Sequence, residues 1–190
     1  MRLAPIDKPA GLKMSIAYFF TQRVLGKVIT PMKVLYPRVP GLLNVGYAIQ
    51  KFQMNGLKLE PALHFLISSW TAQVNGCGFC IDIARAMAVR EHIGMEKFNA
   101  LAEYRTDPMF SDRERAALAY AEEATKVKRV GDETWAALRD HFDDREIVEI
   151  TWINAIENYY NLINIPLQID SDGLCAIAQR RLTDGANDAA

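Results

Sequence analysis

Two cysteines separated by two residues, Cys77 and Cys80, carry the clearest chemistry in the sequence. If Cys77 begins a helix, Cys80 lies one turn further on, on the same face and within reach of a disulfide. The unpaired N–H groups and the dipole of a first helical turn favour a thiolate, which is the nucleophilic form of cysteine. The spacing therefore predicts a reversible intramolecular disulfide.

Two other roles are open to a cysteine pair with this spacing. A structural zinc site needs further ligands, but the remaining cysteine, Cys175, is distant in sequence and the histidines form no pair. We therefore expect no metal ion and no other cofactor. The pair could also be two inert thiols, because free cysteine is among the most buried residue types.

The elements that position the pair are predicted to be helices. Residues typical of helix starts and ends recur along the chain, whereas patterns typical of strands are scarce. Pro40 and Pro61 stand where a first helical residue is expected. The segments Ser111–Glu114 and Asp143–Glu146 each have the pattern of a capping box. The expected helices lie near residues 12–28, 41–55, 61–74, 77–92, 95–105, 112–127, 132–142, 144–164 and 173–181. The fold class is therefore all-α, in a single compact multi-helix domain without the βαβ unit of a thioredoxin fold.

Charge divides the sequence unevenly, since residues 1–59 carry a net charge of +8 and residues 60–190 a net charge of −9. We expect residues 1–40 to form a basic helical arm that packs on the acidic body of its own or a neighbouring subunit. A helical domain over 41–182 and a frayed tail over 183–190 follow. The basic residues are spread through apolar sequence, so we expect no nucleic-acid binding. Without a signal-peptide pattern or an apolar run of ~20 residues, we expect a cytoplasmic protein with no membrane contact.

The segment around the cysteine pair resembles the alkylhydroperoxidase D-like (AhpD-like) branch of the carboxymuconolactone decarboxylase superfamily. The residues that carry the resemblance are Ala72–Asp82, in which Asn-Gly-Cys-x-x-Cys follows an apolar helix and opens the next one. Phe110–Tyr120 and the long helix from Asp143 support it. Together these segments cover roughly residues 60–165, and residues 1–40 contribute nothing to the resemblance.

The resemblance implies a compact helical fold that assembles into homo-oligomers, either trimers or hexamers. It also implies an oxidoreductase with peroxidase activity, in which Cys77 and Cys80 are the catalytic residues. The substrate would be a hydroperoxide, and the electrons would come from a dithiol or lipoyl-type donor, with a peroxiredoxin as a further possible partner. The resemblance suggests that Cys80 meets the peroxide, whereas the helix dipole favours Cys77.

The sequence departs from the AhpD pattern at both positions of its proton relay. That pattern has a histidine four residues after the second cysteine, where this chain has Ala84. It also has a glutamate twelve residues before the first cysteine, where this chain has Phe65. Thiol–disulfide exchange needs a thiolate and an acid for the leaving thiol, so another residue must supply them.

Two residues are candidates for the missing proton relay. His64 stands beside the lost glutamate position and titrates near neutral pH in its usual state. Glu157 belongs to a polar stripe with Asn154, Asn158 and Asn161, at helical spacing on an otherwise apolar helix. The stripe could face solvent or a neighbouring subunit, or it could form a polar wall beside the thiols.

A third candidate is the pair formed by Asp82 and Arg85 on the cysteine helix. Arg85 could lower the pKa of a thiol, but the spacing of three residues predicts that the two side chains form an ion pair with each other.

The sequence therefore predicts a thiol-dependent antioxidant protein. The alternative is a non-redox member of the same fold, either a binding or assembly protein or a cofactor-free lyase, and the missing relay is its main support.

Overall fold

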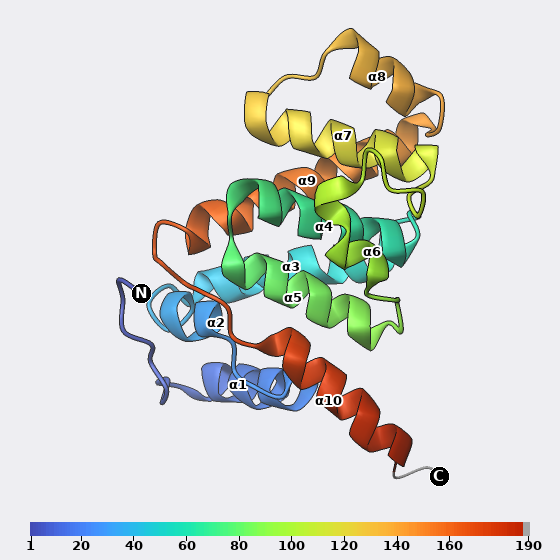
Figure 1. The fold of residues 1–190 in the computed structure, drawn as a ribbon. Helices are drawn as coiled ribbons and strands as arrows, with labels where there is room; N and C mark the ends of the chain where they lie inside the picture. Colours follow the sequence, from blue (N-terminus) through green and yellow to red (C-terminus); the bar gives the residue numbers. More distant parts are fainter. Residues whose placement is uncertain (188–190) are drawn as a thin grey trace.

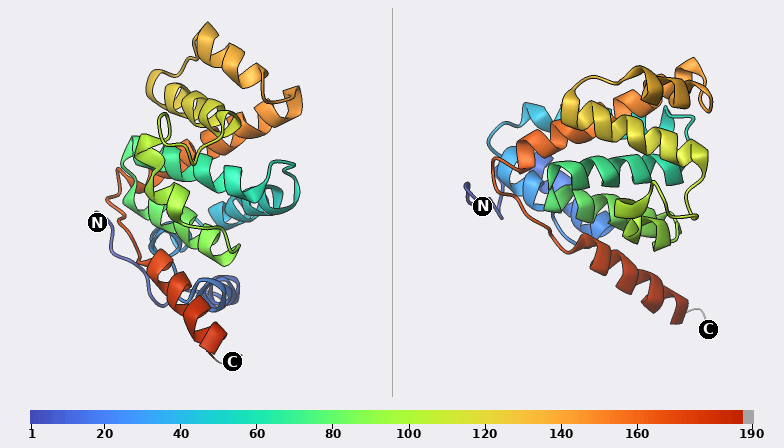
Figure 2. Two further views of the ribbon diagram at one scale, coloured as in Figure 1. Left: turned by 45° about the vertical axis from the view of Figure 1, so that its right-hand side comes forward. Right: turned by 45° about the horizontal axis from the view of Figure 1, so that its top comes forward.

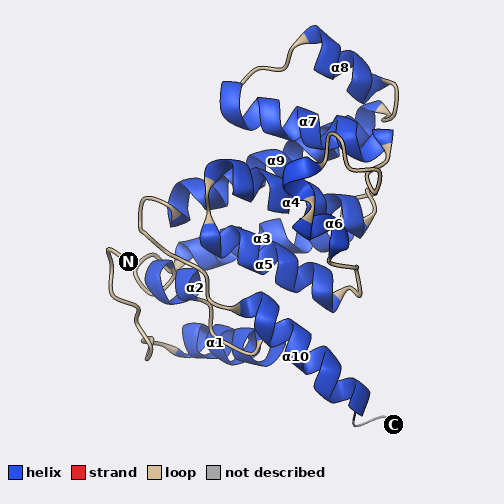
Figure 3. Cartoon of the chain, in the orientation of Figure 1, coloured by secondary structure: helices blue, strands red, loops and turns tan. Residues whose placement is uncertain are grey.

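The computed structural model describes residues 1–187, and every regular element in that range is a helix (Figures 1 and 3). This confirms the predicted all-α class. The elements are α1 (Leu12–Leu25), α2 (Thr30–Leu35), α3 (Gly41–Asn55), α4 (Pro61–Asn75), α5 (Gly78–Arg90), α6 (Glu96–Asn99), the 3₁₀ turn η1 (Leu101–Glu103), α7 (Asp112–Val127), α8 (Asp132–Arg139), α9 (Asp144–Asn164) and α10 (Leu174–Asn187).

Both predicted capping boxes are formed. The Ser111 hydroxyl accepts a hydrogen bond from the backbone N–H of Glu114, and the Asp143 carboxylate accepts one from the N–H of Glu146. In each box the glutamate carboxylate in turn accepts a hydrogen bond from the backbone N–H of the capping residue. The starts of α7 and α9 consequently fall where they were predicted, and α9 also ends at the predicted residue.

Helix α8 ends at Arg139, three residues before its expected end at 142, and four further elements also differ from the expectation. The first helix ends at Leu25, because Gly26 turns into the left-handed region at φ 83°. The short α2, which begins at Thr30 ahead of Pro31, was not expected. The helix expected over 95–105 is divided at Ala100 into α6 and η1. Helix α10 continues to Asn187, well into the tail that was expected to fray, and residues 188–190 lie outside the described range.

Helix α4 lies in the interior of the molecule, packed against α5 on one side and against α7 and α9 on the other (Figure 2). The α4, α7 and α9 contacts form one apolar core, which includes Leu63, Ile67, Ala117, Ile150 and Ile153. A second apolar cluster joins α5, α10 and α2 around the cysteine pair. Helix α4 therefore separates the main core from the cluster that holds the cysteines.

The basic arm packs on its own chain. Helix α1 lies against α10 (Figure 1), and Lys27 forms a 2.7 Å ion pair with Asp172 in the segment that leads into α10. The Asp172 carboxylate also accepts a 2.6 Å hydrogen bond from the backbone N–H of Thr30 at the start of α2. Among the residues that the structure describes, no helix has the length and apolarity needed to cross a membrane.

Candidate active site

Cys77 and Cys80 lie at the turn between α4 and α5 and are joined by a disulfide, with their Cα atoms 5.3 Å apart. Gly76 adopts a left-handed conformation at φ 72°, which ends α4 and reverses the chain. Cys77 is the N-cap of α5, and its own N–H donates a 2.9 Å hydrogen bond to the carbonyl of Ala72. The tight turn thus places both sulfurs over the first turn of α5.

The disulfide is closed off from solvent, since Cys77 is 1% exposed and Cys80 is 2% exposed. Apolar side chains surround it, including Ala72 and Leu174. We call residues 165–173, which connect α9 to α10, the strap. The strap approaches the cysteine helix so closely that a Cβ at Gly78 would lie 2.5 Å from the Asp170 carboxylate. A reactant therefore reaches the sulfurs only when the surrounding elements move.

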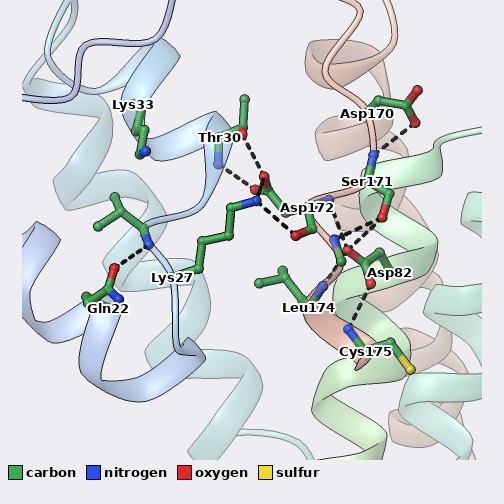
Figure 4. Close-up of polar contacts among 12 residues, drawn as sticks. Gln22, Lys27, Thr30, Lys33, Asp82, Asp170, Ser171, Asp172, Leu174 and Cys175 are labelled. Atoms are coloured by element: carbon green, nitrogen blue, oxygen red, sulfur yellow. Dashed lines mark hydrogen bonds and ion pairs between the residues drawn. The ribbon is translucent and has the colours of Figure 1, made fainter. Parts of the chain in front are cut away.

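Asp82 fastens the strap and α10 to the cysteine helix (Figure 4). Its buried carboxylate accepts hydrogen bonds from the N–H groups of Asp172, Leu174 and Cys175 at 2.8–3.0 Å, and a further one from the Ser171 hydroxyl. The predicted ion pair with Arg85 is wrong, because Arg85 donates instead to the carbonyl of Phe98. Several backbone donors at the start of α10 satisfy the carboxylate better than one neighbouring side chain on the same helix.

Asn164, the last residue of α9, contacts the disulfide directly. Its Nδ2 donates a hydrogen bond to Sγ of Cys80 at 3.4 Å, and the side chain is 2% exposed. The free Cys175 packs on the edge of the same apolar cluster, where burial raises the pKa of its thiol.

The polar stripe on α9 faces the interior of the chain, so of the alternatives left open by the sequence the solvent-facing one is wrong. Asn154 donates to Thr71 on α4 at 3.0 Å and to Thr125 on α7 at 2.8 Å. Asn158 and Asn161 both accept hydrogen bonds from Nδ2 of Asn75, just before the cysteine turn. Amides can face the interior here because α4 and α7 supply polar partners for them.

Glu157 is the titratable member of the stripe and is 9% exposed. Burial raises the pKa of its carboxyl to about 8, while a 2.7 Å hydrogen bond from Nδ2 of Asn161 has the opposite, smaller effect. Asn161 in turn accepts from Asn75. At ~1.5 Å of rise per residue, Glu157 lies roughly 10 Å along α9 from Asn164. The carboxyl is thus in the polar network behind the cysteines without touching the sulfurs.

His64 lies at the other end of α4 from the cysteine turn. It is roughly 16 Å along the helix from Asn75, and its half-buried ring stacks on Phe65 with the centroids 4.9 Å apart. Nε2 of His64 is 3.5 Å from the side-chain amide of Gln53. Burial lowers the pKa of His64 to about 4. The structure does not bring His64 and the cysteines together.

Neither Asn164 nor the role of Asn75 was predicted from the sequence. Asn164 follows Asn161 by three residues, so extending the stripe by one step would have included it. Asn75 offered no comparable signal, because its partners are on another helix. Within residues 1–187, no three His, Cys, Asp or Glu side chains gather closely enough to hold a metal ion.

Comparison with known proteins places this site in a family. Residues 45–123 match the model of the carboxymuconolactone decarboxylase family. The uncharacterized protein YnjA of Escherichia coli K12 is 33% identical over 184 residues, which cover 95% of this chain and all of YnjA.

Two solved structures show the same arrangement of helices. One is a protein of unknown function from Agrobacterium tumefaciens, for which a role as the antioxidant defence protein AhpD is suggested. It has 25% identity and a TM-score of 0.67, over 72% of this chain and 94% of that one. The other is the debrominase Bmp8, with 19% identity and a TM-score of 0.79, over 93% of this chain and 95% of that one.

The chain belongs to the carboxymuconolactone decarboxylase family, in its AhpD-like branch.

Proposed function

We propose that the protein is a thiol oxidoreductase that reduces hydroperoxides through Cys77 and Cys80. The observation that carries the proposal is the disulfide itself, which forms at the first turn of α5 with a hydrogen-bond donor on Cys80. The first turn of a helix stabilises a thiolate, so the reduced pair would be reactive. The suggested antioxidant role of the Agrobacterium relative supports the same chemistry.

The proposed cycle begins with the reduced pair. The Cys80 thiolate attacks an oxygen of the hydroperoxide, the O–O bond breaks, and the alkoxide leaves as an alcohol after taking a proton. Cys80 is then a sulfenic acid. The Cys77 thiol attacks that sulfur, which forms the disulfide and releases water. A dithiol donor restores the two thiols by exchange and becomes a disulfide itself.

Glu157 is the proposed proton donor to this site. A carboxyl with a pKa near 8 is mostly protonated at pH 7 and can give up its proton to a leaving alkoxide. His64 has no part in the proposal, because its contacts are at the far end of α4. Substrate and donor must enter while the elements packed around the disulfide, among them the strap, are displaced, since both cysteines are buried.

The proposed assembly is a homo-oligomer. Helix α3 has no buried residue in this chain, although it carries large apolar side chains such as Tyr47 and Met54. Helix α1 likewise exposes Phe19 and Phe20. Packing against a second subunit would cover such surfaces.

A second candidate is a non-redox protein in which the disulfide is a structural link. The burial of both sulfurs favours it, together with Ala84 and Phe65 at the relay positions. The two candidates differ in whether the disulfide turns over.

Peroxide consumption with dihydrolipoamide as the electron donor separates the candidates. We expect turnover by the wild type, loss of at least about 100-fold in Cys80→Ser, and normal turnover in the matched control Cys175→Ser. Mass spectrometry after stoichiometric peroxide should show the Cys77–Cys80 link with Cys175 alkylated. If the wild type consumes no peroxide, and the Cys77–Cys80 link is present without added peroxide and is not opened by dihydrolipoamide, the structural role is correct.

A further inference from the structure

The side-chain N–H group of Asn164 donates its hydrogen bond to a sulfur atom, in a site that is buried away from solvent. Its Nδ2 lies 3.4 Å from Sγ of Cys80, and both residues are almost fully buried. The backbone carbonyl of Asn164 also accepts a 3.0 Å hydrogen bond from the backbone N–H of Ile169, and this bond holds the end of α9 in place. The amide therefore points at Cys80 from a fixed backbone.

The other half of the same amide is unpartnered. Oδ1 of Asn164 is buried and has no hydrogen-bond partner among the described residues. Leaving a buried acceptor unsatisfied costs free energy, so a structural asparagine would be expected to use both groups. The unused acceptor is available to a thiol S–H, which the disulfide lacks.

We infer that Asn164 is a catalytic residue that stabilises the Cys80 thiolate, which makes Cys80 the sulfur that attacks the peroxide. This inference rests on the proposed function. The amide donates N–H to the thiolate and, after rotating about its terminal bond, accepts S–H from the thiol. It serves both protonation states without titrating, so it stabilises the thiolate but transfers no proton.

The charged groups around Cys80 leave this role to Asn164, because each is engaged elsewhere or remote. On α5, the Asp82 carboxylate is held by the strap and by α10, and Arg85 donates to Phe98. On α9, Glu157 lies about two turns from Asn164, and with a pKa near 8 its carboxyl is mostly uncharged at neutral pH. In the strap, Asp170 accepts from the N–H of Ser171, and Asp172 pairs with Lys27. The remaining titratable neighbours are Tyr160 on α9 and Cys175 on α10, which are uncharged in their usual states at neutral pH.

An apolar environment disfavours a thiolate. Without a cation in contact, the stabilising groups are the N–H dipoles of the α5 first turn and the amide of Asn164. Removing the amide should therefore make Cys80 a weaker acid while the helix turn stays intact.

The test is the ionisation of Cys80 in the reduced, full-length protein. Thiolate absorbance near 240 nm and the pH dependence of iodoacetamide labelling at Cys80, read by mass spectrometry, are measured for wild type, Asn164→Leu and Asn164→Asp. We expect the pH at which half of the Cys80 thiol is ionised, its midpoint, to rise by about one to two pH units in Asn164→Leu. It should rise at least as far in Asn164→Asp, because a carboxylate repels the thiolate.

The matched control is Asn154→Leu, which removes another buried amide of α9 that bonds to Thr71 and Thr125 rather than to sulfur. It should lower stability and leave the Cys80 midpoint in place. If Asn164→Leu does not fold, the near-isosteric Asn164→Asp decides the question. An unchanged Cys80 midpoint, or a pH response at Cys77 alone, overturns the inference even when the wild type reduces peroxide. If Asn164→Leu shifts the Cys80 midpoint but the wild type does not turn over peroxide, the proposed function is refuted, while the effect of Asn164 on the ionisation of Cys80 still stands.

Discussion

The carboxylate of Asp82 accepts a 2.8 Å hydrogen bond from the backbone N–H of Leu174, the first residue of α10. Asp82 is two residues beyond Cys80, whereas Leu174 follows the strap, whose Ile169 packs in the same apolar cluster as both cysteines. One buried side chain therefore joins the helix that carries the cysteines to the strap and to α10, which pack beside them.

Replacing Asp82 by asparagine should loosen this connection. Asparagine has one acceptor oxygen in place of two and adds an N–H₂ group that faces the donors of α10. We expect the free energy of unfolding to fall by about 1–3 kcal/mol and the disulfide to be reduced faster by a small phosphine. The measurements are urea unfolding and the rate of thiol release.

The matched control for this change is Asp170→Asn in the strap. Asp170 is exposed, and its carboxylate accepts a hydrogen bond from the N–H of its neighbour Ser171. The control should behave as the wild type. Equal reduction rates for Asp82→Asn and wild type would show that the strap does not limit access to the disulfide.

Glu157 should make the protein less stable as the pH rises. Its pKa in the folded protein is about 8, against 4.5 for an ordinary glutamate. The folded state therefore holds a proton that the unfolded state releases, so the stabilising contribution is complete below about pH 4.5 and is lost as the pH rises through about 8. Glu157→Gln should flatten the decline in unfolding free energy over this window, as measured by urea unfolding at several pH values. A wild type whose stability does not fall between pH 5 and 8 would contradict the raised pKa.

His64 should have the opposite pH dependence and no effect on peroxide reduction. Its pKa in the folded protein is about 4, below the usual 6.5. The stabilising contribution of the neutral ring is therefore present above about pH 6.5 and is lost as the pH falls through about 4. His64→Gln should lessen the acid sensitivity of the unfolding free energy and leave the peroxidase rate near pH 7 unchanged. A large drop in that rate would restore His64 to the proton relay.

The sequence alone determined the features that depend on neighbours within a few residues. The Ser111 and Asp143 capping boxes are local patterns, so the helices that follow begin where they were predicted. The spacing of Cys77 and Cys80 is also local, because one helical turn brings the two sulfurs within bonding distance.

Tertiary structure decided the surroundings of the cysteines, because those contacts join residues that are far apart in the chain. Asp82 could pair with Arg85 or cap α10, and only the docking of α10 supplies the backbone donors that prevail. The α9 stripe has the same periodicity whether it faces water or the interior, and partners on α4 and α7 turn it inward. The contact of Asn164 with Cys80 likewise exists because α9 ends beside the first turn of α5. Local spacing determines which residues share a helix face, but the free energy of burying that face depends on what the rest of the fold places against it.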